Sequence, residues 1–150
     1  IVLVNEYNSG KTRTNTLVGN AAATYKILDN LSYRALVGLD YNLIQEDRYR
    51  DPRTPDGAGV RGRATAATDW RTRFITTHTL NWNKTFNNVH NVSALAGFEF
   101  VSETRQGING ESINFPTFQF RYVDSGAEPV FVGGFWTGYR RQGAFMSGNY

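Results

Sequence analysis

The feature that most constrains this chain is the alternation of apolar with mostly polar residues over residues 31–43. Every odd-numbered position in the segment is apolar, and the even-numbered positions between them are mostly polar. Successive side chains of a β-strand point to opposite faces of a sheet, so this period of two predicts a two-sided strand. The apolar positions are Leu31, Tyr33, Ala35, Val37, Leu39, Tyr41 and Leu43.

The same alternation predicts four more strands. Three of them cover residues 16–28, 69–86 and about 91–103, and a fifth begins near Tyr139 and continues to the end of the sequence. Two of the turns between them are very short, because the pairs at residues 29–30 (Asp-Asn) and 87–88 (Asn-Asn) tolerate left-handed backbone.

The other two connections are predicted to be long loops. They cover residues 47–68 and 107–138, and both contain proline and glycine. Short turns at one end of a sheet and long loops at the other are the arrangement of outer-membrane β-barrels. We therefore predict an all-β fold that is a segment of a large antiparallel transmembrane β-barrel.

The length of the predicted strands favours a barrel over a soluble sheet. Ordinary strands have about 5–6 residues, whereas a strand that crosses a bilayer needs about 9–11. The mean hydropathy of −0.45 fits this interpretation, because a spanning strand presents only alternate residues to lipid. A half-buried soluble sheet stays open as the alternative, although its strands would be unusually long.

Aromatic spacing defines the face that we expect to contact lipid. Tyr33 and Tyr41 are eight residues apart on one face, and so are Phe74 and Trp82. Eight tilted residues span roughly 20 Å, close to the ~25 Å apolar band of outer-membrane barrels. His78 shares the parity of Phe74 and fits poorly, so that either an imidazole faces lipid or a bulge changes the register. The predicted lipid-facing residues are Tyr33, Val37, Leu39, Tyr41, Phe74, Leu80, Trp82, Phe98 and Phe100.

The composition and the motifs argue against several other classes of function. The sequence has no cysteine, which excludes thiolate metal sites and thiol nucleophiles. Its net charge of +3 comes without a dense basic cluster, so we expect no nucleic-acid partner. The two histidines have no metal-ligand spacing, and no catalytic triad or phosphate loop is visible. We therefore expect no enzyme activity, no cofactor and no metal.

Two stretches resemble a known family. One is Thr-Leu-Asn-Trp-Asn-Lys-Thr-Phe at residues 79–86 followed by His-Asn-Val-Ser-Ala-Leu-Ala-Gly-Phe-Glu-Phe at residues 90–100, and the other is Arg-Arg-Gln-Gly-Ala-Phe-Met-Ser-Gly-Asn-Tyr at residues 140–150. They resemble barrel strands of the SusC/RagA-type TonB-dependent transporters of Bacteroidetes. In that family a strand, a tight turn with a His-Asn pair and a strand ending in Gly-Tyr/Phe-Glu recur.

The resemblance implies a function and a set of partners. Members of the family import oligosaccharides or peptides across the outer membrane beneath a SusD-like surface lipoprotein, with energy from the TonB-ExbB-ExbD complex. The family barrel has about 22 strands and a plugged lumen. Residues 1–150 would then be a partial barrel domain without the plug domain, the TonB-box segment or the closing C-terminal strand. Outer-membrane lipid would surround it.

The second predicted loop supplies the candidate substrate contacts. Exposed aromatic rings offer flat apolar surfaces on which sugar rings stack, and the other interpretation is that they pack the loop against itself or a partner. The candidates for substrate or lid contact are Trp136, Tyr139, Phe135 and Tyr122. Two alternatives stay open: a secreted soluble β-sheet adhesion module, and an outer-membrane enzyme, for which no nucleophile and base are evident.

Overall fold

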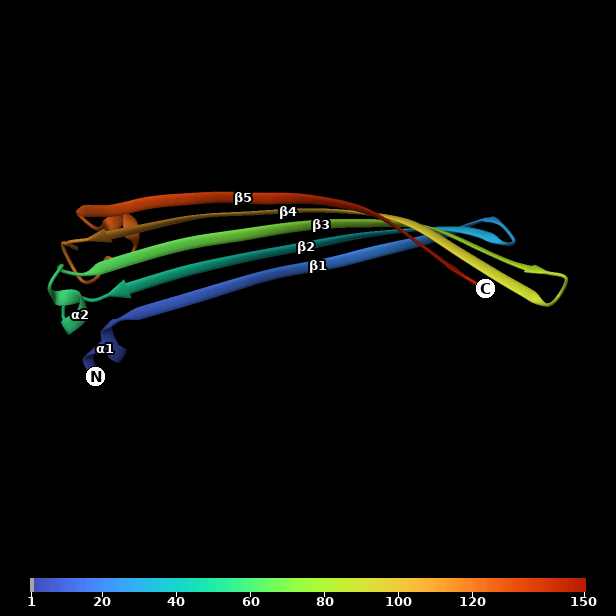
Figure 1. Ribbon diagram of the computed structural model, residues 1–150. Helices are drawn as coiled ribbons and strands as arrows, with labels where there is room; N and C mark the ends of the chain where they lie inside the picture. Colours follow the sequence, from blue (N-terminus) through green and yellow to red (C-terminus); the bar gives the residue numbers. More distant parts are fainter. Residues whose placement is uncertain (1) are drawn as a thin grey trace. The chain divides into compact units, whose positions relative to one another are not determined.

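The protein is an almost entirely β structure. The computed structural model describes residues 2–150, and its five strands form one antiparallel sheet in chain order (Figure 1). The elements, in order, are α1 (Val2–Tyr7), β1 (Ser9–Leu28), β2 (Leu31–Arg50), α2 (Pro55–Ala58), β3 (Arg63–Phe86), β4 (His90–Ile113), a short 3-10 helix (Val123–Ser125) and β5 (Glu128–Asn149).

The strands are longer than the alternation predicted. They contain 20, 20, 24, 24 and 22 residues. The predicted loops 47–68 and 107–138 were therefore too long, since each shortens to the residues between neighbouring strand ends (51–62 and 114–127). The ladder continues there because backbone pairing does not depend on hydrophobic alternation, which disappears where both faces are polar or glycine-rich.

The two short turns are confirmed. Residues 29–30 join β1 to β2, and residues 87–89 join β3 to β4. Asn87 and Asn88 have φ values of 51° and 54°, the left-handed backbone for which asparagine was expected. The amide of Val89 closes the second turn on the carbonyl of Phe86 at 3.1 Å.

Cross-strand side-chain pairs show which residues share a face. Thr16 meets Asn42, Tyr33 meets His78, Asp69 meets Arg105, and Glu103 meets Tyr139. Because neighbours across a ladder share a face, these pairs link the parities of all five strands. Face A carries odd residues of β1 and β2 and even residues of β3, β4 and β5. Face B carries the opposite set.

The chain divides into two compact units. Unit 1 comprises Ile1–Thr16, Asn42–Arg71 and Arg105–Thr137, and unit 2 comprises Leu17–Tyr41, Thr72–Thr104 and Gly138–Tyr150. Unit 1 has a small core of Tyr49, Ala64 and Phe115 with Val123 packed against it. The rings of Tyr49 and Phe115 meet edge to face, with centroids 5.3 Å apart.

In unit 2, the aromatic ring of Phe145 lies over a glycine on face B. A Cβ placed on Gly97 would collide with the ring of Phe145 on the neighbouring strand. The ring covers backbone that glycine leaves bare and fixes the register of β4 against β5, an arrangement known to compensate glycines in sheets. Gly97 is therefore required by its neighbour and not by its own backbone angles.

We predict that Gly97→Ala destabilises the protein by about 1–3 kcal/mol, the usual cost of overpacking. Gly143→Ala is the matched control, because nothing lies within 4 Å of a Cβ at that position of β5. Unfolding midpoints of the protein in detergent micelles, followed by circular dichroism, measure both changes. Adding Phe145→Leu to Gly97→Ala should recover most of the loss, and equal losses for the two glycines would contradict the assigned packing.

Candidate functional site

The nine predicted lipid-facing residues all lie on face A of unit 2. Each has the parity of that face on β2, β3 or β4. Several are largely exposed, with Val37 and Leu39 at 42% and Phe98 at 43%. Exposed apolar side chains on one face of long strands form a surface suited to lipid, while the ladder pairs their backbone groups. Contact of this surface with lipid stays a prediction.

His78 also lies on face A, and no bulge moves it to the other face. Its Nδ1 is 2.5 Å from the hydroxyl of Tyr33, and its Nε2 is 3.1 Å from the hydroxyl of Thr76. The rings of His78 and Tyr33 are stacked with centroids 5.9 Å apart. Both ring nitrogens therefore have partners on the same face, which lowers the cost of placing an imidazole in an apolar environment.

Face B is lined by polar pairs. In unit 2, Arg141 lies 3.4 Å from Glu99, and Tyr139 donates to Glu103 at 3.4 Å. In unit 1, Arg105 donates to Asp69 through Nε and Nη2 at 2.5–3.1 Å. These neighbouring pairs are compatible with a hydrated surface, which is what the lumen side of a barrel wall requires.

The four candidate contact residues occupy different environments. Phe135 and Trp136 belong to β5 and not to a loop, so their side chains point to opposite faces. Phe135 lies on face B beside Gly107, with the Arg105 guanidinium carbon 5.4 Å from its ring centroid. Trp136 lies on face A and is 66% exposed.

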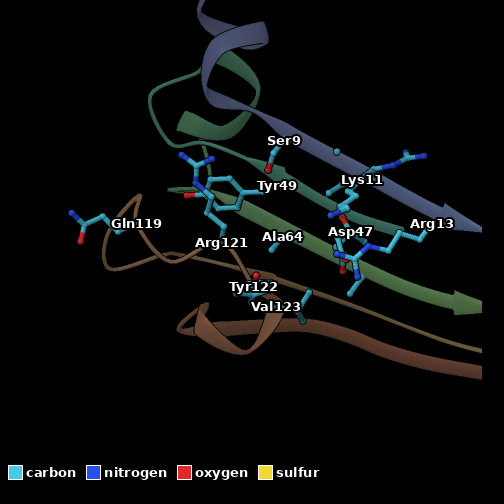
Figure 2. Close-up of a pocket in the computed structure, with 14 residues that line it drawn as sticks. Ser9, Lys11, Arg13, Asp47, Tyr49, Ala64, Gln119, Arg121, Tyr122 and Val123 are labelled. Carbon is cyan, nitrogen blue, oxygen red and sulfur yellow. The ribbon is translucent and has the colours of Figure 1, made fainter. Parts of the chain in front are cut away.

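Tyr139 and Tyr122 complete the set. Tyr139 belongs to unit 2, where its hydroxyl donates to Glu103. Tyr122 belongs to unit 1, is 73% exposed, and lines a cleft beneath the 114–127 connection (Figure 2). The three candidates in unit 1, Phe135, Trp136 and Tyr122, therefore do not line one common pocket. A role for any of the four candidate residues in substrate or lid contact stays a prediction.

A polar cluster in unit 1 that the sequence did not reveal holds the loop regions together. The Asp51 side chain is fully buried and receives three hydrogen bonds from Arg53, from its amide, Nε and Nη2, at 2.8–2.9 Å. These bonds keep the pKa of Asp51 below its ordinary value although burial opposes the shift. Asn8 and Thr54 extend the cluster through the Asp51 backbone.

The guanidinium of Arg53 also joins separate segments of unit 1. Its central carbon lies 3.9 Å from the ring centroid of Tyr7 and 4.1 Å from that of Phe118. One side chain thus contacts α1, the 51–62 connection and the 114–127 connection through cation–π and ionic interactions. The only sequence signal was the turn composition of residues 51–57, which does not show long-range partners.

Neither a metal-ligand cluster nor a membrane-spanning helix is found among residues 2–150. No group of three or more histidine and carboxylate side chains in that range is placed to hold a metal ion. Within the same range, no helix combines the length and the apolar character needed to cross a membrane.

Among the comparisons with known proteins, only those with solved structures give a match. No family model and no curated protein matches the sequence. Among solved structures, the RagAB peptide transporter matches with a TM-score of 0.88 at 16% identity, covering 96% of this chain and 16% of that chain. The RagAB peptide importer in its closed-closed state gives 0.89 at 17% identity, and in its open-open state 0.87 at 16%, each covering 97% of this chain and 16% of the other.

The fold is therefore that of a barrel segment from a SusC-like transporter. This confirms the predicted fold class and, at the level of fold, the resemblance found in the sequence. The chain spans about 16% of the length of the chains it matches. The activity, substrates and partners of a whole transporter are accordingly matters for proposal.

We predict that Arg53→Ala raises hydrogen exchange in residues 51–62. The expected loss is about 3 kcal/mol of local stability, because the substitution leaves the buried carboxylate of Asp51 without its ion-pair partner. Arg48→Ala is the control, since its ion pair with Glu46 is exposed and worth under about 1 kcal/mol. Exchange is read by mass spectrometry on the intact protein. Similar protection in the two variants would show that the Asp51–Arg53 pair does not hold the connection.

Proposed function

We propose that this chain forms part of the wall of an outer-membrane transporter that imports peptides or oligosaccharides. The observation that carries the proposal is the structural match of nearly the whole sheet to the RagAB peptide transporter. The separation of an exposed apolar face A from a polar face B in unit 2 supports it, because a barrel wall contacts lipid on one side and water on the other.

Peptides are the better supported substrate class. The matched structures are described as a peptide transporter and a peptide importer. The ion pairs on face B suit the charged ends and side chains of peptides, whereas the aromatic residues named for sugar stacking do not share one surface. We therefore place peptides before oligosaccharides.

The same proposal includes partners. A SusD-like surface lipoprotein would cover the substrate above the two longer connections, and the TonB-ExbB-ExbD complex would supply energy through a plug region outside these residues. In this role the chain is structural and does not catalyse a reaction.

A secreted soluble adhesion module has less support. A soluble monomer rarely exposes a contiguous apolar patch larger than about 300–600 Å². Face A of unit 2 presents exposed apolar residues on four consecutive strands, including Leu17, Leu39, Leu80 and Phe98. Such a face needs lipid or another covering layer.

Membrane topology is testable with single cysteines, because the sequence has none. Ala58→Cys lies in α2 of a longer connection, Val89→Cys in a short turn, and Leu39→Cys on face A. We expect a membrane-impermeant maleimide to label position 58 in intact cells and position 89 only after the outer membrane is permeabilised. Position 39 should resist labelling until the protein is unfolded.

These outcomes separate the two accounts. A soluble module would be recovered without detergent and would be labelled at all three positions without permeabilisation. Labelling of position 89 but not of position 58 in intact cells would place the short turns outside and contradict the proposed orientation.

Transport itself is tested by uptake. Cells with the complete transporter should accumulate a labelled peptide mixture at least about tenfold faster than cells from which its gene is deleted, while uptake of labelled oligosaccharides stays unchanged. If deletion of the gene abolished only oligosaccharide uptake, the substrates would be oligosaccharides and not peptides. Unchanged uptake of both would refute the import function.

A further inference from the structure

Unit 1 contains a positively charged cleft on face A. Its volume is about 750 Å³, and it is lined by β1, β2, β3 and the 114–127 connection (Figure 2). Three cationic side chains line the cleft against the single carboxylate of Asp47. The cations are Lys11, Arg13 and Arg121.

The cations of the cleft are only partly neutralised. Lys11 and Arg13 form no ion pair with any residue from 2 to 150. Arg121 donates to the carbonyl of Phe118 at 3.5 Å. Figure 2 shows Lys11 and Arg13 on one side of the cleft and Arg121 beside Tyr49 on the other. The surplus positive charge favours an anionic ligand.

Tyr49 adds a hydrogen-bond donor. It lines the cleft, is only 2% exposed, and its hydroxyl has no hydrogen-bond partner among the described residues. Burial, followed by the charge of Asp51, raises the pKa of the phenol, so the hydroxyl keeps its proton. A buried donor without an acceptor is costly, and an anionic oxygen that enters beside Arg121 would satisfy it.

The same face of unit 1 carries an apolar patch. Trp70, Ile108, Val132 and Trp136 line a shallow depression, in which Val132 is 74% exposed and Trp136 66%. Trp70 follows the cleft residue Ala66 on β3 by four residues, roughly 13 Å along the strand. Tryptophan near basic side chains is characteristic of the boundary between membrane and water, where indole rings and cations meet lipid headgroups.

We propose that this cleft binds the phosphate group of an anionic membrane lipid whose apolar part lies against the Trp70–Trp136 patch. The inference rests on the proposed function, because it requires face A to adjoin a membrane. The patch favours a lipid over free phosphate, since a soluble anion gains nothing from exposed tryptophan and valine. Lys11 and Arg13 offer the phosphate oxygens their donors on one side of the cleft, and Arg121 and the Tyr49 hydroxyl offer theirs on the other.

The test measures retention of dioleoylphosphatidic acid by the complete transporter purified from outer membranes, using native mass spectrometry. Lys11→Ala/Arg13→Ala should weaken retention roughly 25-fold, since each cation near an anionic lipid contributes about fivefold. The matched control is Lys26→Ala/Arg34→Ala, which removes the same charges from face B of unit 2. This control should bind as the parent does.

A second variant examines the hydroxyl without disturbing the packing. Tyr49→Phe keeps the ring against Phe115 and should weaken retention of phosphatidic acid about tenfold. Equal retention by the parent and Lys11→Ala/Arg13→Ala, or equal binding of phosphatidylcholine, would overturn the lipid site. Full displacement of the lipid by millimolar inorganic phosphate would identify a free-anion site instead.

Failure of the proposed function has a different signature. In that case the protein is absent from the outer-membrane fraction before any lipid is added. A protein that is recovered from the outer membrane but retains no phosphatidic acid contradicts only the lipid site.

Discussion

The rest of the structure depends on one constraint. In each of the four long antiparallel pairings, the residues paired across the two strands lie on the same face of the sheet. A slip of one residue in any pairing would transfer every side chain of a strand to the other face. Pairs such as Tyr33 with His78 and Glu103 with Tyr139, together with the ring of Phe145 over Gly97, fix the register. Apolar residues of four strands therefore share face A, and ion pairs can form on face B.

The position of His78 follows from this constraint. Moving it to face B would take Phe74, Leu80 and Trp82 with it, and burying those residues among ion pairs would cost more than one imidazole on face A. The strand keeps its register, and the polar cost is met locally by the hydroxyls of Tyr33 and Thr76. A residue that violates the hydrophobic pattern is thus accommodated by its neighbours and not by a bulge.

The fold could be predicted from the sequence because the alternation within each strand shows which residues share a face. Features that depend on contacts between distant segments could not be predicted in this way. The ends of the strands were missed because alternation fades where both faces are polar. Trp136 and Phe135 were grouped as loop aromatics, although adjacent strand residues must point apart. The Asp51–Arg53 cluster and the basic cleft could not be predicted from the sequence. Their members come from segments far apart in the chain, so no cluster of charge appears in the sequence.

The chemistry of face A changes along single strands, and this change locates the edge of the apolar layer. On β1 the odd positions are apolar from Ile27 to Leu17 and become basic at Arg13 and Lys11. On β2 the change falls between Leu43 and Asp47. In the proposed barrel wall, about 9–11 residues of each strand would cross the bilayer, so strands of 20–24 residues would continue well beyond it. The segments beyond the change carry the cleft, so in the proposed wall its cations would lie at the level of the headgroup phosphates.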